Sequence, residues 1–261
     1  MITAEQARML IEAGIHNGEF PSRLYKYREF NENTESIFSE NSLWFSKPSA
    51  FNDPFDCQIH DATIYTQEEV ETYLIKRAGA PPEVVIGIAK IFESTPDFFS
   101  QLLAVVKQNV IGSKGILSLS KYPDNILMWS HYAKSPSGFV LGFDILKDIP
   151  FFTAPLNINY QKDYPSFQFL KEPGKIVSHG VITKSELWSY EGEIRVIKNE
   201  PGKHKFAKKC LKEVIIGYRT EQKDREKIIQ YLKQYFYDDV ELKQAAPSKT
   251  GFTIEISPMI I

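Results

Sequence analysis

The stretch that decides the fold is the C-terminal run from Glu213 to Ile256. It opens with EVIIG (213–217), continues through a strongly helical segment over 221–235, and ends with VELKQ (240–244) and FTIEI (252–256). The sequence therefore predicts a β-α-β-β run that packs against a larger sheet. Whether the crossover joins parallel strands stays open at this point.

Further strands and helices are predicted upstream of this run. Apolar residues at helical spacing indicate a helix within residues 1–20, and residues 67–110 read as helices with turn signals at 80–82 and 94–96. No internal repeat or long linker separates these segments. We therefore expect one α+β domain over 1–261, with a mixed, mostly antiparallel sheet, flanking helices and a helical insertion around 67–110. The other predicted strands are 23–28, 42–46, 115–120, 138–143, 156–160 and 193–197.

Composition narrows the class of protein. The chain has 261 residues, a formal net charge of −2, 43% hydrophobic and 25% charged residues, which are ordinary globular values without a global attraction to nucleic acid. Its two cysteines, Cys57 and Cys210, exclude a disulfide scaffold and fit a reducing compartment. Its apolar runs are far shorter than the roughly 20 residues of a membrane span, and Glu5 and Arg8 interrupt the first of them. These features predict a cytoplasmic protein without a membrane partner.

The first cluster that could carry chemistry is LYKYR (24–28). On a strand, Tyr25 and Tyr27 share one face, while Lys26 and Arg28 share the other. Two cations on one face can hold a phosphate or a carboxylate. The alternative is a solvated edge strand whose aromatic side chains lie in the core.

The second cluster is LWFSKPSAFNDPFD (43–56), which reads as a strand followed by a turn. Asn52 and Asp53 before Pro54 favour a turn because their side chains bond their own backbone. Since functional residues concentrate on loops, Ser46 and Asn52 are candidate binding residues. A purely structural connection is the alternative.

The third cluster is SLSKYPDNILMWSHY (118–132). Asp124 is a candidate cap for a short helix that carries Trp129 and Tyr132. His131 has a side chain suited to proton transfer near neutral pH, although a packed core histidine is the alternative. Without a second His or Cys at ligand spacing, we expect no metal site.

The fourth cluster is LWSYEGEIR (187–195). In an extended conformation, Glu191, Glu193 and Arg195 project from one face, and Arg195 offsets the repulsion between the carboxylates. A surface ladder of charges is the alternative. The adjacent aromatics Trp188 and Tyr190 favour a functional interpretation.

The ordered motifs LYKYR, LWFSKPSAFNDPFD, DNILMWSHYA with GFVLGFD, and LWSYEGEIR resemble the bacterial domain-of-unknown-function family 2971 over roughly residues 23–217. That resemblance implies kinship and no particular activity. A second resemblance is to the Arg, Ser-Thr-Ser, Glu-x-Glu pattern of ADP-ribosyltransferases.

This second resemblance implies roles for five residues. Arg28 would hold the NAD phosphates, and Ser118 or Ser120 would orient the nicotinamide half. Glu193 would bond the ribose hydroxyl, and Glu191 would help to activate the acceptor. The sequence departs from the pattern where Leu119 replaces the threonine, and the WSHY motif has no counterpart. Another alignment uses Tyr25 and LWFSKPSAFND, which is similar to a segment of poly-ADP-ribose polymerases.

The leading hypothesis is an enzyme that cleaves the nicotinamide–ribose bond of NAD, with a protein or nucleic acid as possible acceptor and no metal. One rival is a metal-dependent phosphodiester hydrolase that uses Asp53, Asp56, Asp124, Glu193 and His131. The other is a non-catalytic binding or sensor module in a defence or toxin system. The expected catalytic residues are Glu193, Glu191 and His131, and the expected NAD-binding residues are Tyr25, Lys26, Arg28, Ser46, Asn52, Ser118, Ser120, Trp129, Tyr132, Tyr190 and Arg195.

Overall fold

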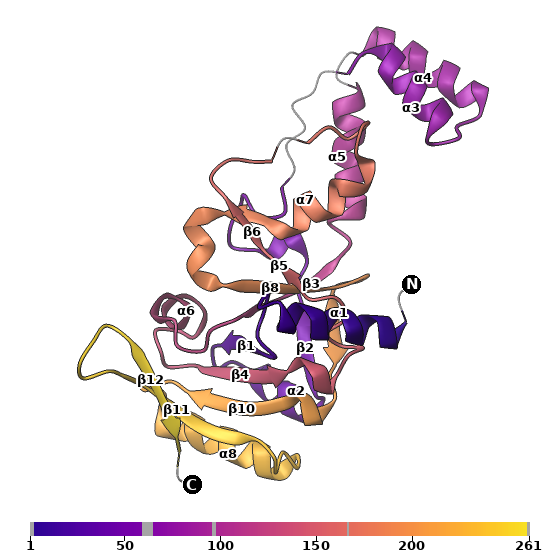
Figure 1. Ribbon diagram of the computed structural model, residues 1–261. Coiled ribbons are helices and arrows are strands. Elements are labelled where there is room, and N and C mark those ends of the chain that lie inside the picture. The colour runs from indigo at the N-terminus through magenta and orange to yellow at the C-terminus, as the bar shows by residue number, and fades with distance from the viewer. Residues whose placement is uncertain (1–2, 59–64, 96–97, 166, 260–261) are drawn as a thin grey trace. The chain divides into compact units, whose positions relative to one another are not determined.

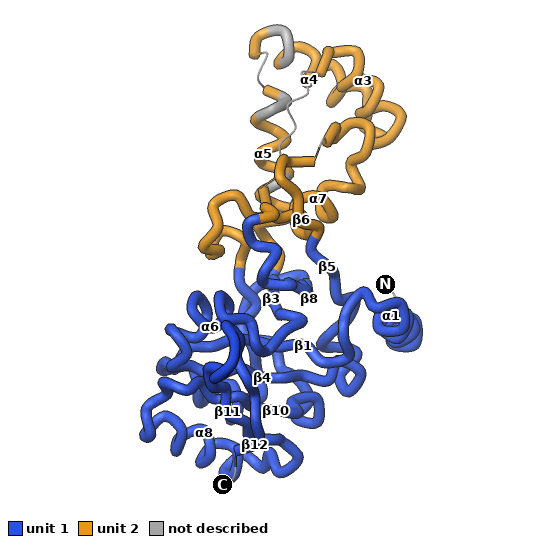
Figure 2. The backbone as a smooth tube through the Cα atoms, turned by 60° about the vertical axis from the view of Figure 1, so that its left-hand side comes forward, with its two compact units in different colours: residues 1–46, 115–158, 187–261 blue, residues 47–114, 159–186 orange. Residues whose placement is uncertain are grey.

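The computed structural model describes residues 3–58, 65–95, 98–165 and 167–259 (Figure 1). The chain divides into two compact units (Figure 2). Unit 1 contains residues 1–46, 115–158 and 187–261, and unit 2 contains 47–114 and 159–186. Helices and a large mixed sheet occur together, which confirms the predicted α+β class. The predicted single domain stays a prediction.

Unit 1 is built on an eight-stranded sheet with the order β12-β11-β10-β4-β1-β3-β8-β5. Neighbouring strands are antiparallel except for β10 and β11, which are parallel and joined through helix α8 (Gln222–Gln234). The predicted C-terminal β-α-β-β run is thus confirmed, and its crossover is parallel. The strands are β1 Arg23–Arg28, β3 Gly115–Ser120, β4 Phe139–Asp144, β5 Leu156–Asn157, β8 Glu193–Lys198, β10 Leu211–Ile216, β11 Glu241–Pro247 and β12 Ile254–Pro258.

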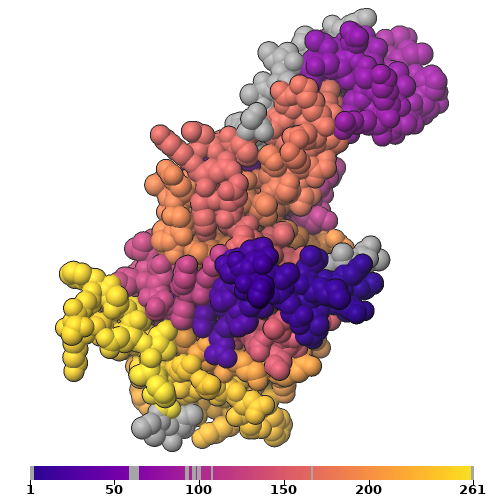
Figure 3. Space-filling model, viewed as in Figure 1, coloured from indigo at the N-terminus to yellow at the C-terminus, as the bar shows by residue number. Residues whose placement is uncertain are grey.

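The main hydrophobic core lies on one face of this sheet, called the core face here. Alternate strand residues such as Leu24, Leu141 and Val214 point to it, as the two-residue period of a strand requires. Helices α1 (Ala4–His16), α2 (Thr34–Ser39) and α8 contribute buried residues to this core. In the space-filling view, α1 (indigo) and the C-terminal hairpin (yellow) form part of the visible surface of unit 1 (Figure 3).

The opposite face is covered in part by the short helix α6 (Ile126–Tyr132) and is called the α6 face here. Tyr27, Val140 and Ile215 pack there with Met128 and Trp129. The cap of α6 is Asn125 and not Asp124, so the predicted cap was wrong by one residue. Asn125 has extended backbone angles, and its Oδ1 accepts hydrogen bonds from the backbone N–H groups of residues 127 and 128.

Smaller elements complete unit 1. Strands β2 (Ser42–Phe45) and β9 (Gly202–Lys205) form an antiparallel pair, and β9 and α2 were not predicted.

The predicted strand 156–160 is two strands. β5 pairs with β8, while β6 (Asn159–Gln161) pairs with β7 (Thr183–Ser185) in unit 2. The short 3₁₀ segments in the two units are η1 Pro48–Ala50, η2 Ile145–Lys147, η3 Pro173–Lys175, η4 Glu186–Glu191 and η5 Lys208–Cys210.

Unit 2 contains the predicted helical insertion. Helices α3 (Gln67–Lys76), α4 (Pro82–Ser94) and α5 (Phe98–Val110) fall within 67–110, and α4 begins at the predicted turn. Pro96 of the second turn signal lies outside the described residues. A further helix, α7 (Ile176–Ile182), was not predicted. None of the helices in the described ranges combines the length and the apolar character of a membrane span.

Candidate functional site

Three of the four sequence clusters meet on neighbouring strands of unit 1. Tyr25 of β1 lies opposite Ser120 of β3, and Ser120 lies opposite Glu193 of β8. Ser118 lies opposite Arg195 in the same ladder. Side chains that face each other across neighbouring strands share a face of the sheet, so all five belong to the α6 face. The polar residues of β3 and β8 therefore lie beside the apolar patch under α6.

Lys26 links β1 to β3 through its side chain. The two strands pair in register at Tyr25 and Ser120, and Lys26 Nζ donates a hydrogen bond to the backbone carbonyl of Ser118 at 2.8 Å. Burial, together with the neighbouring Arg28, lowers the pKa of Lys26 to about 8, against the opposing effect of Glu193 and Glu191. The ammonium group thus lies within electrostatic reach of both carboxylates.

Arg28 lies at the end of β1, paired with Phe139 on β4. It points to the core face because it alternates with Tyr25 and Tyr27, so the structure places it on the opposite face from Glu193. Its Nε is buried and has no hydrogen-bond partner among the described residues. Burial lowers the pKa of this guanidinium. A buried, poorly satisfied cation next to Lys26 is costly unless an anion accompanies it.

Glu193 and Arg195 form a buried bidentate ion pair within β8. Arg195 Nε lies 2.7 Å from Glu193 Oε1, and Arg195 Nη2 lies 3.1 Å from Oε2. Both residues are buried. Their spacing of two residues places them on the same strand face, as the sequence predicted. The pair is strong because both carboxylate oxygens face the guanidinium fork.

Glu191 departs from the predicted geometry because it ends the 3₁₀ segment η4 and is not part of the strand. Gly192, with a φ of 51°, turns the chain between Glu191 and Glu193. The expected shared strand face for Glu191, Glu193 and Arg195 is therefore wrong for Glu191. A Cβ on Gly192 would also lie 2.6 Å from the Tyr122 ring, so both backbone conformation and space require glycine here.

The buried Glu191 is held by two short hydrogen bonds. Tyr132 donates its hydroxyl to Glu191 Oε1 at 2.6 Å, and the Ser120 hydroxyl donates to the Glu191 backbone carbonyl at 2.6 Å. The side chain of Asn125 donates to the Tyr190 carbonyl at 2.8 Å. Helix α6 and strand β3 together therefore fix the loop that carries the carboxylate.

Four ring side chains surround this loop and are called the aromatic cluster here: His131, Tyr132, Trp188 and Tyr190. The centroid of the His131 ring lies 6.0 Å from that of Tyr190 and 6.5 Å from that of Trp188, and the Trp188 and Tyr190 centroids are 6.0 Å apart. His131 is exposed, while the other three are partly buried. Such a cluster offers accessible ring surface next to a carboxylate, which suits a flat or cationic group.

Trp129 does not contribute ring surface to this cluster. It is fully buried, its Nε1 donates to the Pro123 carbonyl at 2.9 Å, and its ring packs edge-on against Tyr27 at 5.5 Å. A tryptophan with both its ring and its N–H satisfied inside the protein is a core residue. The predicted role of Trp129 in stacking on a ligand therefore has no exposed ring to support it.

The remaining predicted residues lie elsewhere. Ser46 forms a backbone bridge with Ile116 beyond the end of β2, and Asn52 is an exposed residue of unit 2. For the hydrolase rival, the described parts of the chain contain no group of three or more His, Cys, Asp or Glu residues arranged to hold a metal ion. Asp53 and Asp56 are buried in unit 2, where Asp56 lies 3.7 Å from Lys184.

A second polar cluster on the α6 face was missed by the sequence reasoning. Glu213 on β10 is buried and lies 2.9 Å from Arg23 and 2.5 Å from Lys243. Burial raises the pKa of Tyr25, and the negative charge of Glu213 and its hydrogen bond with the tyrosine raise that pKa further. Arg23 and Glu213 are 190 positions apart, so no local pattern points to their contact.

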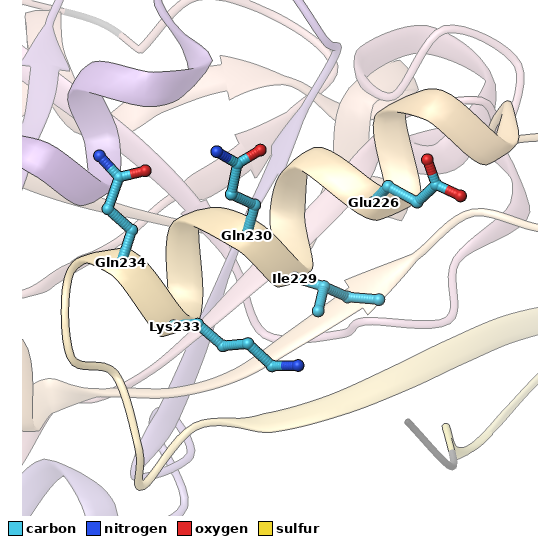
Figure 4. Close-up of a pocket in the computed structure, with 5 residues that line it drawn as sticks. All are labelled: Glu226, Ile229, Gln230, Lys233 and Gln234. Atoms are coloured by element: carbon cyan, nitrogen blue, oxygen red, sulfur yellow. The ribbon is translucent and has the colours of Figure 1, made fainter.

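A surface cavity of about 650 Å³ lies along α8 and is lined by Glu226, Ile229, Gln230, Lys233 and Gln234 (Figure 4). All five side chains come from one helix, and none was a predicted site residue. The cavity is thus separate from the carboxylate loop. Comparison of the chain with family models, curated proteins and solved structures finds no match.

Proposed function

We propose that this chain is an ADP-ribosyltransferase-like enzyme that cleaves the nicotinamide–ribose bond of NAD, and that it is kin to the bacterial domain-of-unknown-function family 2971. One observation carries the proposal: the three motifs of the resemblance lie on the adjacent strands β1, β3 and β8. Tyr25, Ser120 and Glu193 are in register across them. Motifs more than 60 residues apart in the sequence thus come together in one part of the sheet.

The charges of the site match the chemistry of NAD. Lys26 and Arg28 are two largely buried cations that repel each other, and the pyrophosphate of NAD would offset that repulsion. Glu191 and Glu193 supply buried negative charge for the positive charge that develops on the ribose as the bond breaks. The aromatic cluster supplies ring surface for the nicotinamide.

We assign different roles in this proposal to the two cations, Lys26 and Arg28. Lys26 and Arg28 share one face of β1, but Lys26 interacts electrostatically with Glu191 and Glu193, whereas Arg28 interacts with Glu29. Lys26 is therefore the cation that we place next to the reacting half of NAD, and Arg28 holds the more distant phosphate. The acceptor of ADP-ribose is a protein, a nucleic acid or water. Both cysteines are buried and not joined in a disulfide, which favours a cytoplasmic location.

The test is release of nicotinamide from NAD by the purified full chain, with and without a cell lysate as acceptor source. Lys26→Ala is expected to lower kcat/KM by about 100-fold, since it removes the buried charge beside the carboxylates. Lys249→Ala removes an exposed lysine of the same unit and serves as the matched control. Absence of release by the wild-type chain, together with no thermal shift on addition of NAD, would exclude this function.

A further inference from the structure

Helix α4 of unit 2 exposes an apolar side to solvent. Val84, Ile86 and Ile91 are 42%, 56% and 39% exposed. The inward side of the helix carries Val85, which is buried, and Ile88, which packs against a hydrophobic cluster of the same unit. A helix that is apolar around most of its circumference is normally buried on all sides. The outward side of α4 therefore has the character of a surface that packs against another protein element.

Three residues on this outward side, Val84, Gly87 and Ile91, are called the α4 stripe here. Their spacings of three and four residues are those of a seam along which two helices pack. A Cβ on Gly87 would meet no atom of the described residues within 4 Å, so packing inside the chain does not require a glycine here. Glycine in the middle of a helix is unfavourable by itself, but it lets another backbone approach closely. The α4 stripe therefore fits a second helix.

Two charged residues identify which helix this is. Glu83 and Lys90 are exposed and are seven residues apart, so they lie on the same edge of the α4 stripe, about two turns from each other. When two copies of one helix pack antiparallel around a twofold axis, the same edges meet in opposite directions. Glu83 of one copy then faces Lys90 of the other, and Lys90 of the first faces Glu83 of the second. The charges of α4 are thus complementary to those of a second, antiparallel α4.

We infer that the α4 stripe is the interface of a homodimer, in which α4 packs antiparallel against α4 of a second copy of this chain. The twofold axis passes next to Gly87, which lies at the midpoint between Glu83 and Lys90. Contact between two single helices buries a small area, so we expect a reversible dimer with a Kd on the order of 10 µM. This inference goes beyond the proposed function and does not depend on it.

The first experiment is sedimentation velocity of the full chain over a concentration range that brackets this Kd. The wild type is expected to pass from monomer to dimer as its concentration rises, whereas Gly87→Lys is expected to stay a monomer. The new side chain blocks close approach and brings two like charges together at the axis.

Thermal unfolding of dilute samples, in which the wild type is a monomer, shows whether Gly87→Lys folds. We expect its Tm to equal or exceed that of the wild type, because lysine is a better helix former and its Cβ meets open space. A Gly87→Lys chain that dimerises like the wild type overturns the inference. A Tm lower by more than about 3 °C also overturns it, since the position would then be packed inside the chain.

The second experiment reverses the charges beside the α4 stripe. Glu83→Lys and Lys90→Glu are each expected to raise the dimer Kd by about 10-fold, because each replaces two attractions by two repulsions. Both substitutions in one chain should restore the Kd to within about threefold of the wild type. Glu68→Lys is the matched control, since Glu68 is the exposed second residue of α3 and the change has the same effect on net charge and on the helix dipole.

An equimolar mixture of the Glu83→Lys and Lys90→Glu chains distinguishes a second copy from any other occupant of the stripe. At these two positions one chain carries two positive charges and the other two negative charges, so we expect the mixture to dimerise at least as well as the wild type. Contact of the stripe with another part of the same chain, or with a different protein, leaves all samples monomeric and overturns the inference. Equal dimerisation of the wild type and both single variants places the interface elsewhere and overturns it as well.

Discussion

Replacement of Gly142 by alanine tests how the second polar cluster of the α6 face holds the sheet together. Gly142 on β4 lies between Tyr25 on β1 and Glu213 on β10. The Glu213 side chain passes directly over it toward Arg23, and a Cβ on Gly142 would lie 2.5 Å from Glu213 Cγ. Ordinary contacts of this kind are about 3.5 Å or longer, so Glu213 would have to move by roughly 1 Å.

The cost follows from the contacts that such a shift would break. Disruption of a fully buried ion pair costs about 3–5 kcal/mol. The side chains of Arg23 and Lys243 remain 36% and 21% exposed, so water compensates part of the loss and we expect about 2–3 kcal/mol. Alanine recovers about 0.5–1 kcal/mol relative to glycine in a strand. The net decrease in the free energy of unfolding is therefore about 2 kcal/mol.

Urea unfolding followed by tryptophan fluorescence measures this decrease. Gly251→Ala is the matched control, since the nearest atom to its added Cβ lies 4.0 Å away, and we expect it to be close to neutral. Combination of Gly142→Ala with Glu213→Ala should cost about as much as Glu213→Ala alone, because the clash requires the glutamate. Fully additive costs, or a Gly142→Ala variant as stable as the wild type, would refute the reasoning.

Three further predictions concern single side chains. Asn125→Ala should lower the free energy of unfolding by about 1 kcal/mol through loss of the α6 cap, while Asp124→Ala should change it little; urea unfolding of both variants decides. Because the folded-state pKa of Lys26 is lowered from 10.5 to about 8, burial of its charge costs stability below pH 8 and that cost disappears as the pH rises toward 10.5. The stability of the wild type relative to Lys26→Met should therefore increase over this window, and a constant difference would contradict it. Burial raises the pKa of the Cys210 thiol, so a thiol reagent should label this residue only after denaturation.

The order of the elements could be read from local patterns. Alternation in RLYKYR predicted which side chains of β1 share a face, and Tyr27 and Leu24 do lie in opposite cores. The sequence also predicted the C-terminal helix and its flanking strands, because apolar residues recur with a characteristic period in a helix and in a strand. The sequence did not indicate that the predicted strand 156–160 divides into β5 and β6. The division depends on tertiary pairing, because β5 pairs with β8 whereas β6 pairs with β7.

Only part of the membership of the candidate site follows from the sequence, because the predicted residues Ser46 and Asn52 lie elsewhere and Trp129 is a core residue. The residue types and their order along the chain indicated Lys26, Ser120, Glu191 and Glu193, but not how each would be held. Gly192 illustrates the difference: the sequence shows a glycine between two glutamates, and an extended conformation was the simplest expectation. In the folded chain Gly192 has a φ of 51°, and the Tyr122 ring occupies the space that a Cβ would need.

By itself, the sequence determined the α+β class, the positions of most helices and strands, and the face to which each residue of β1 points. Tertiary structure alone decided that β1 lies between β4 and β3, that Glu213 reaches Arg23, and that Arg195 clamps Glu193 while Tyr132 holds Glu191. The physical reason is the distance along the chain over which each effect acts. Backbone periodicity acts over a few residues, whereas the partner of a buried charge depends on which distant strands are aligned beside it.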